Sequence, residues 1–138
     1  MLTVTTIVNT ELVKHAFQEV PKECCGILAG RGNAIQQNYR ITNTARNSSK
    51  FIMKSDEQIQ AMSDIKQNGL NILGFYHSHP NGVQNPSSSD IKMAIQSGWS
   101  GDTIFHVIVA LENDTTPLIS AYNIFKSGLV IRQPLKLA

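Results

Sequence analysis

The sequence contains little cysteine, little charge and no long hydrophobic run. Its 138 residues include two cysteines, 12 Lys and Arg, and 10 Asp and Glu, which leaves a net charge of +2. The two cysteines, Cys24 and Cys25, are adjacent. Adjacent cysteines rarely bond to each other, so no disulfide framework is expected. This cysteine usage fits a reducing, cytoplasmic setting.

These absences exclude several classes of protein. The basic residues are scattered, without the run of Lys and Arg that would follow a phosphate backbone, so we expect no nucleic-acid partner. No stretch is apolar enough to span a bilayer, and residues 1–10 lack the pattern of a signal peptide, so we expect no membrane association. The length predicts one domain over residues 1–138, large enough to bury an ordinary core.

Hydrophobic patterning and turn residues predict an α/β chain of the α+β type, with one curved mixed sheet flanked by helices. Thr10 and Ser87 are expected as helix caps, and Asn113-Asp114 as a turn. The predicted helices cover residues 11–19, 55–68 and 87–96. The predicted strands cover residues 24–29, 34–41, 51–53, 71–79, 103–111 (the most apolar, expected near the centre), 118–125 and 129–132.

The most informative segment is His77-Ser78-His79-Pro80, which follows the apolar run 72–76. Side chains two residues apart on a strand point to the same face, so His77 and His79 can converge on one point. Asp90 follows in what reads as the first turn of a helix. Two imidazoles and a carboxylate with a fourth position free have the composition of a catalytic zinc site.

Each of these residues also has an ordinary structural interpretation. Ser87-x-x-Asp90 fits a capping box, and one carboxylate oxygen could bind metal while the other meets the backbone. Glu23 is one of ten acids, and spacing alone does not place it beside the histidines. His15 and His106 are expected to be packed or surface residues. Ser78 either supports the ligand strand or serves as a spacer.

Together, Glu23, His77-Ser78-His79-Pro80 and Ser87-x-x-Asp90 resemble the JAMM motif of the MPN+ (Mov34/Jab1) metallopeptidases. The likeness extends to residues 21–30 around the glutamate and to residues 43–58, and it covers roughly residues 1–132. Within this family, the chain looks most like the small prokaryotic members.

The resemblance implies a role for each motif residue. His77, His79 and Asp90 would bind Zn²⁺, with water as the fourth ligand. Glu23 would accept the proton of that water and pass it to the leaving amine. Ser87 would hydrogen-bond the water or the oxyanion. A ligand set of two histidines and one aspartate also admits other divalent ions.

The resemblance further implies cleavage of an amide or isopeptide bond at the C-terminus of a ubiquitin-like protein or a ThiS/MoaD-type sulfur carrier. Release of cysteine or of a tail from such a carrier is the leading interpretation. A desampylase- or deubiquitinase-like isopeptidase, and a non-catalytic module that binds a ubiquitin-like partner, stay open. A cupin-type metal site is disfavoured because residues 87–96 read as helix. The chain could also form a homodimer.

Overall fold

The computed structural model describes residues 1–112 and 116–138, and the turn expected at Asn113-Asp114 lies outside them. Within the described residues there are three helices, none of them long and apolar enough to cross a membrane. These helices are α1 (Thr6–Glu19), α2 (Ser55–Gln67) and α3 (Ser88–Gln96). The strands are β1 (Leu2–Val4), β2 (Cys25–Arg31), β3 (Ala34–Ile41), β4 (Asn71–His79), β5 (Gly101–Ala110), β6 (Leu118–Ile124), β7 (Val130–Gln133) and β8 (Leu135–Leu137).

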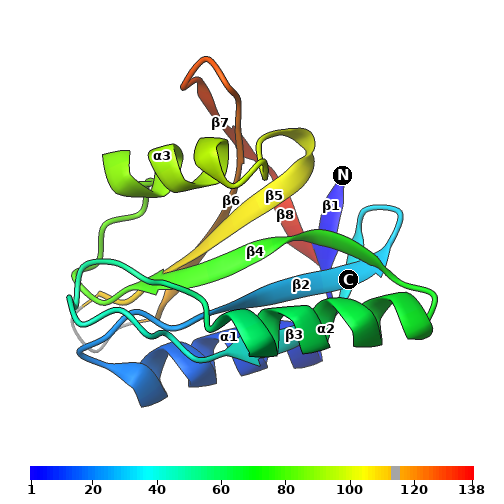
Figure 1. The fold of residues 1–138 in the computed structure, drawn as a ribbon, viewed down its shortest axis with the longest axis horizontal. Coiled ribbons are helices and arrows are strands. Elements are labelled where there is room, and N and C mark those ends of the chain that lie inside the picture. Colours follow the sequence, from blue (N-terminus) through cyan, green and yellow to red (C-terminus); the bar gives the residue numbers. More distant parts are fainter. Residues whose placement is uncertain (113–115) are drawn as a thin grey trace.

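The described strands form one mixed sheet in the order β7-β6-β5-β4-β2-β3-β1-β8. Strand β4 pairs antiparallel with β2 and parallel with β5, so it lies at the middle of the sheet. Figure 1 shows β4 running between helix α3 above and helix α2 below. The predicted α+β architecture with a single mixed sheet flanked by helices is confirmed.

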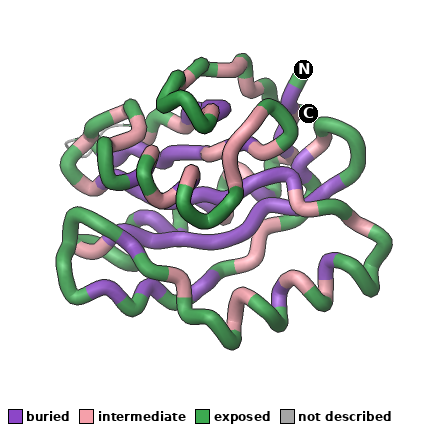
Figure 2. The backbone as a smooth tube through the Cα atoms, turned by 45° about the horizontal axis from the view of Figure 1, so that its top comes forward, coloured by how far each residue is buried: buried purple, intermediate pink, exposed green. Residues whose placement is uncertain are grey.

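The two faces of the sheet bury separate apolar clusters. Helix α1 packs on one face through Val8, Leu12 and Ala16, together with Cys24 and Leu28 from the sheet. Helix α2 packs on the other face, where Ala61 and Ile65 meet a second cluster; its other buried members are Cys25, Ile27, Ala29, Ile41, Phe51 and Phe75. The most buried backbone therefore runs through the middle of the molecule (Figure 2). The adjacent cysteines contribute to opposite faces, as alternation along a strand requires.

A polar link crosses the α1 face of the core. The fully buried Tyr76 on β4 has its hydroxyl 2.8 Å from Nδ1 of His15 on α1, and the Asn38 amide donates to the same hydroxyl. Because the hydroxyl accepts from Asn38, its own proton is free to go to Nδ1 of His15. His15 is thus a packed histidine, as expected.

The structure differs from the sequence predictions in four elements. Helix α1 starts at Thr6 with Thr5 as its cap, so the predicted cap at Thr10 is wrong. The strand predicted over 51–53 is reduced to one bridge, between Asn43 and Met53. Strands β1 and β8 were not predicted. They pair with each other in parallel, and β1 also pairs with β3.

Candidate metal centre

Strand β4 brings His77 and His79 to the same face of the sheet, as their spacing predicts. His77 lies opposite Cys25 of β2 and Ile108 of β5, so its backbone is held on both sides. Both imidazoles are buried. The buried Ser78 between them points to the other face, where its Oγ accepts a hydrogen bond from the Cys24 backbone N–H at 2.8 Å. This bond favours the supporting role for Ser78 over that of a spacer.

Asp90 reaches the histidines from the first turn of α3. Ser87 caps this helix: its Oγ accepts from the Asp90 N–H at 3.0 Å, while its own N–H donates to Asp90 Oδ2 at 2.9 Å. The predicted capping box is confirmed. In this structure Oδ2 alone meets both the backbone and the histidines, so the possible division between the two carboxylate oxygens stays a prediction for the ion-bound state.

Three donor atoms converge on one point at the centre of this arrangement. Asp90 Oδ2 lies 3.0 Å from His77 Nε2 and 3.1 Å from His79 Nε2, and the two nitrogens are 3.1 Å apart. A tetrahedral ion with bonds of about 2.0 Å separates its ligand atoms by about 3.3 Å. The spacing of the donors therefore fits a small divalent ion bound by two imidazoles and one carboxylate.

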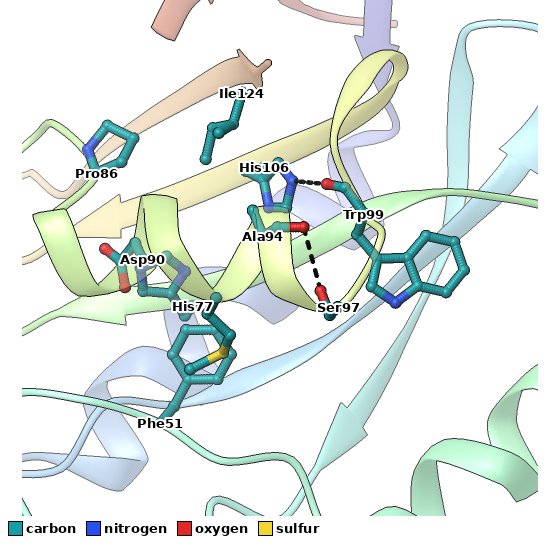
Figure 3. Close-up of a pocket in the computed structure, with 10 residues that line it drawn as sticks. Phe51, His77, Pro86, Asp90, Ala94, Ser97, Trp99, His106 and Ile124 are labelled. Atoms are coloured by element: carbon teal, nitrogen blue, oxygen red, sulfur yellow. Dashed lines mark hydrogen bonds and ion pairs between the residues drawn. The ribbon is translucent and has the colours of Figure 1, made fainter. Parts of the chain in front are cut away.

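The rings of both histidines are held in place by neighbouring groups. His79 Nδ1 lies 2.8 Å from the Val83 carbonyl, and this contact places a ring proton on Nδ1, so Nε2 is the nitrogen that would face an ion. The Phe51 ring stacks on His77 with centroids 4.6 Å apart (Figure 3). The loop after β4 and the segment around Phe51 therefore orient the two imidazoles.

Glu23 completes the cluster from the segment just before β2. One atom from each of Glu23, His77, His79 and Asp90 falls in a group whose members all lie within 4.8 Å of one another. Among the described residues, Glu23 Oε1 is buried without a hydrogen-bond partner. An unpartnered buried carboxylate oxygen is costly, which points to a ligand or substrate group that it would meet.

The two acids of the cluster are electrostatically different. Burial raises the pKa of Glu23 to about 7, with His79 opposing the rise and Asp90 adding to it. Burial also raises the pKa of Asp90, but hydrogen bonds from His77 and His79 outweigh it and hold that pKa far below its usual range. For His79, burial lowers the pKa, while the contacts with Asp90 and Val83 outweigh this and leave it raised.

Other candidates from the sequence lie outside the cluster. Burial raises the pKa of both Cys24 and Cys25 to about 12, so these thiols are packing groups and not nucleophiles at neutral pH. His106 has its Nε2 2.7 Å from the Trp99 carbonyl and is a packed residue, as expected.

A cavity of about 50 Å³ lies between α3 and the sheet, beside His77 and Asp90; its walls include Phe51, Met93, Ala94, Trp99, His106 and Ile124 (Figure 3).

Sequence reasoning missed Asn43, Phe51 and the Val83 carbonyl as groups around the site. Asn43 and Phe51 lie in an irregular segment, where the strand predicted over 51–53 is reduced to one bridge and gave no indication of contacts with the site. The Val83 group is backbone, which no sequence motif displays.

A family model described as prokaryotic homologs of the JAB domain matches residues 5–123. The chain belongs to this family. Its resemblance to the JAMM metallopeptidases, inferred from the motif alone, is therefore confirmed.

Two relatives are identical to this family member at about a quarter of the aligned residues. A desampylase of Haloferax volcanii is 27% identical, with 73% of this chain and 89% of that protein covered. A CysO-cysteine peptidase of Mycobacterium tuberculosis is 26% identical over 90% of this chain and 82% of the relative. Together with the buried Glu/His/His/Asp cluster, these matches confirm the prediction of a JAMM-type metallopeptidase.

Two solved structures resemble this member of the family. A protein of Desulfitobacterium hafniense gives a TM-score of 0.86 at 30% identity, with 100% of this chain and 93% of that chain covered. A JAB1/MPN domain protein of Archaeoglobus fulgidus gives a TM-score of 0.62 at 18% identity, with 100% and 97% covered. The second likeness supports the fold.

Proposed function

We propose that this chain is a zinc peptidase that hydrolyses an amide or isopeptide bond at the C-terminus of a ubiquitin-like sulfur carrier. The observation that carries the proposal is the buried cluster of Glu23, His77, His79 and Asp90. The donor set fits Zn²⁺, with His77, His79 and Asp90 as the residues that would hold it. Bound there, the ion would supply Lewis acidity and an acidified water.

The roles of the chain's own residues follow from their surroundings. Glu23 has a pKa raised by burial to about 7 and an oxygen that no group in the described part of the chain pairs with, so it is suited to take a proton from water and return it to the leaving amine. Asp90, with its lowered pKa, stays anionic and is suited to hold a cation. Ser87 Oγ already accepts from the helix, which leaves its hydroxyl proton free for a substrate oxygen.

The proposed substrate is a carrier from which a small residue is released. The relatives include a CysO-cysteine peptidase, and a small, mostly apolar cavity lies beside His77 and Asp90. The alternative substrate is an isopeptide conjugate, which the desampylase relative favours. We further propose that the chain acts without nucleic acid, in the cytoplasm. A homodimer remains a proposal that light scattering of the purified protein would test.

The test is incubation of the zinc-loaded protein with two matched fusions, a carrier ending Gly-Gly-Cys and the same carrier joined to a lysine side chain. We expect mass spectrometry to show release of cysteine, faster than cleavage of the isopeptide. Glu23→Gln should abolish cleavage and keep about one Zn²⁺ per chain, since the acid is outside the proposed ligand set. Cleavage by Glu23→Gln at the wild-type rate would overturn the proposal.

The non-catalytic alternative makes the opposite predictions. A module that only binds a ubiquitin-like partner would retain no zinc after purification without chelator. It would also bind its partner equally well after His77→Ala. Elemental analysis and a binding titration therefore separate the two readings.

A further inference from the structure

The peptide group that follows Glu23 is held by two side chains. The Glu23 carbonyl accepts a hydrogen bond from Asn43 Nδ2 at 2.8 Å. The N–H of Cys24, on the other side of the same peptide group, donates to Ser78 Oγ at 2.8 Å. These partners come from separate parts of the chain, so the orientation of this peptide depends on tertiary contacts.

The Asn43 side chain uses all of its hydrogen-bonding capacity. Nδ2 donates to the carbonyls of Glu23 and of Lys50, the latter at 3.2 Å. Oδ1 accepts from the backbone N–H of Ala45 at 2.9 Å and of Ile52 at 3.0 Å. A carboxamide offers two donors and two acceptor lone pairs, and all four are matched here. The residue is 6% exposed, so water does not compete for these bonds.

Through these bonds, Asn43 connects two members of the cluster. It fixes the backbone of Glu23 directly. It also closes the loop 44–52, which carries Phe51, and the Phe51 ring stacks on His77. Since Glu23 Oε1 has no partner of its own among the described residues, the position of this carboxylate depends on the backbone that Asn43 and Ser78 hold.

We propose that Asn43 is a positioning residue that sets the Glu23 carboxylate and the His77 ring in their working geometry. Its kinetic consequence rests on the proposed peptidase activity, whereas its structural consequence does not. Asn43 touches neither a proposed ligand side chain nor a substrate, so it acts through the Glu23 carbonyl and through the loop.

The kinetic experiment compares Asn43→Ala and Asn43→Asp with a matched control, Asn47→Ala. Asn43→Asp has nearly the same shape but loses both donors. Asn47 lies in the same loop, is exposed, and accepts hydrogen bonds from the neighbouring Ser49. On a carrier fusion that the wild type cleaves, both Asn43 variants should lower kcat by about 10 to 100-fold, because small displacements of a reacting group are costly. KM should stay within a factor of about three, and Asn47→Ala should match the wild type.

A second readout needs no substrate. The Phe51 ring stacked on His77 should shift the NMR resonances of the His77 ring protons. We expect Asn43→Ala and Asn43→Asp to move these resonances toward those of Phe51→Leu, while Asn47→Ala leaves them in place. Thermal melting of each variant checks that it is folded. If Asn43→Ala does not fold, the comparison is made with Asn43→Asp.

The outcomes separate the two proposals. If the wild type cleaves no carrier fusion, the proposed function fails, and the NMR comparison alone decides the role of Asn43. Wild-type kcat in folded Asn43→Asp, or unchanged His77 resonances in both Asn43 variants, would overturn the role of Asn43 while leaving the peptidase intact.

Discussion

Burial raises the pKa of both acids of the site, Glu23 and Asp90, but other contacts make the outcomes opposite. The pKa of Glu23 is raised overall and that of Asp90 is lowered. Within residues 1–112 and 116–138, Glu23 Oε1 has no hydrogen-bond partner, and burial raises the pKa of Glu23 to about 7. Asp90 receives hydrogen bonds from two histidines and from the Ser87 N–H, which keep it anionic. Two carboxylates whose pKa values differ in this way suit different roles, in which Glu23 exchanges protons and Asp90 stays charged.

His15 gives a prediction about pH. Burial lowers the pKa of His15 from 6.5 to about 4, with Arg40 adding to the fall. In the unfolded chain the same imidazole takes up a proton near pH 6.5, so the unfolded state binds more protons between pH 6.5 and 4. The free energy of unfolding should therefore fall as the pH drops from 7 to 5, by roughly 1 to 2 kcal/mol from this residue.

The measurement is urea unfolding of the wild type and of His15→Gln at pH 7 and pH 5. Glutamine can still accept from the Tyr76 hydroxyl but does not titrate. His15→Gln should show a smaller loss between the two pH values. An equal loss in both proteins would assign the pH dependence to other groups.

Single residues differ in how far the sequence revealed them. His77, His79 and Asp90 were found because strand alternation and a helix cap impose fixed spacings that a reader of the sequence can recognise. Asn43 was not, because its four partners are backbone groups brought together by the fold. Glu23 lies near the histidines because β2 pairs antiparallel with β4, and spacing along the sequence does not reveal that register. Before the structure, only the motif resemblance indicated that Glu23 belongs to the site.

Among the elements, the first turn of α3 serves both the fold and the site. The same Ser87 hydroxyl caps the helix and is proposed to meet the substrate. We expect Ser87→Ala to lower the free energy of unfolding by about 1 kcal/mol, since it removes the acceptor of the Asp90 N–H. Ser87→Thr keeps that acceptor and should cost only a few tenths of a kcal/mol. Urea denaturation of both variants measures the difference, and equal stability of Ser87→Ala and the wild type would contradict it.

Elements with a long apolar pattern were predicted well, and short ones were not. Strands β1 and β8 have three residues each, too few for a period, and they form because each completes a ladder with the other. The first turn of α1 contains β-branched residues of low helix propensity. It is helical because Thr5 caps it and Val8 is buried against the sheet. Tertiary contacts decided these elements.

For the whole molecule, the groups that would hold the ion gather in the folded chain, so ion binding should stabilise the folded state. Zinc at 100 times its dissociation constant would add about 2.7 kcal/mol, which corresponds to a rise in melting temperature of roughly 5 to 10 °C. A chelator should reverse the rise. His77→Ala should show little of it when both proteins are melted by calorimetry with and without zinc. An equal rise in His77→Ala would place the ion elsewhere.

The order of the cluster along the chain has a consequence for a protein that is still folding. His77 and Asp90 are thirteen positions apart and joined by one loop, so a local segment brings the three ion-binding groups together. The proton acceptor, Glu23, joins them only through the β2–β4 ladder and the bond between Cys24 and Ser78, 54 positions apart. A copy in which β2 has not yet paired with β4 therefore lacks the proposed proton acceptor. Hydrolysis should thus be confined to copies in which the central ladder of the sheet is complete.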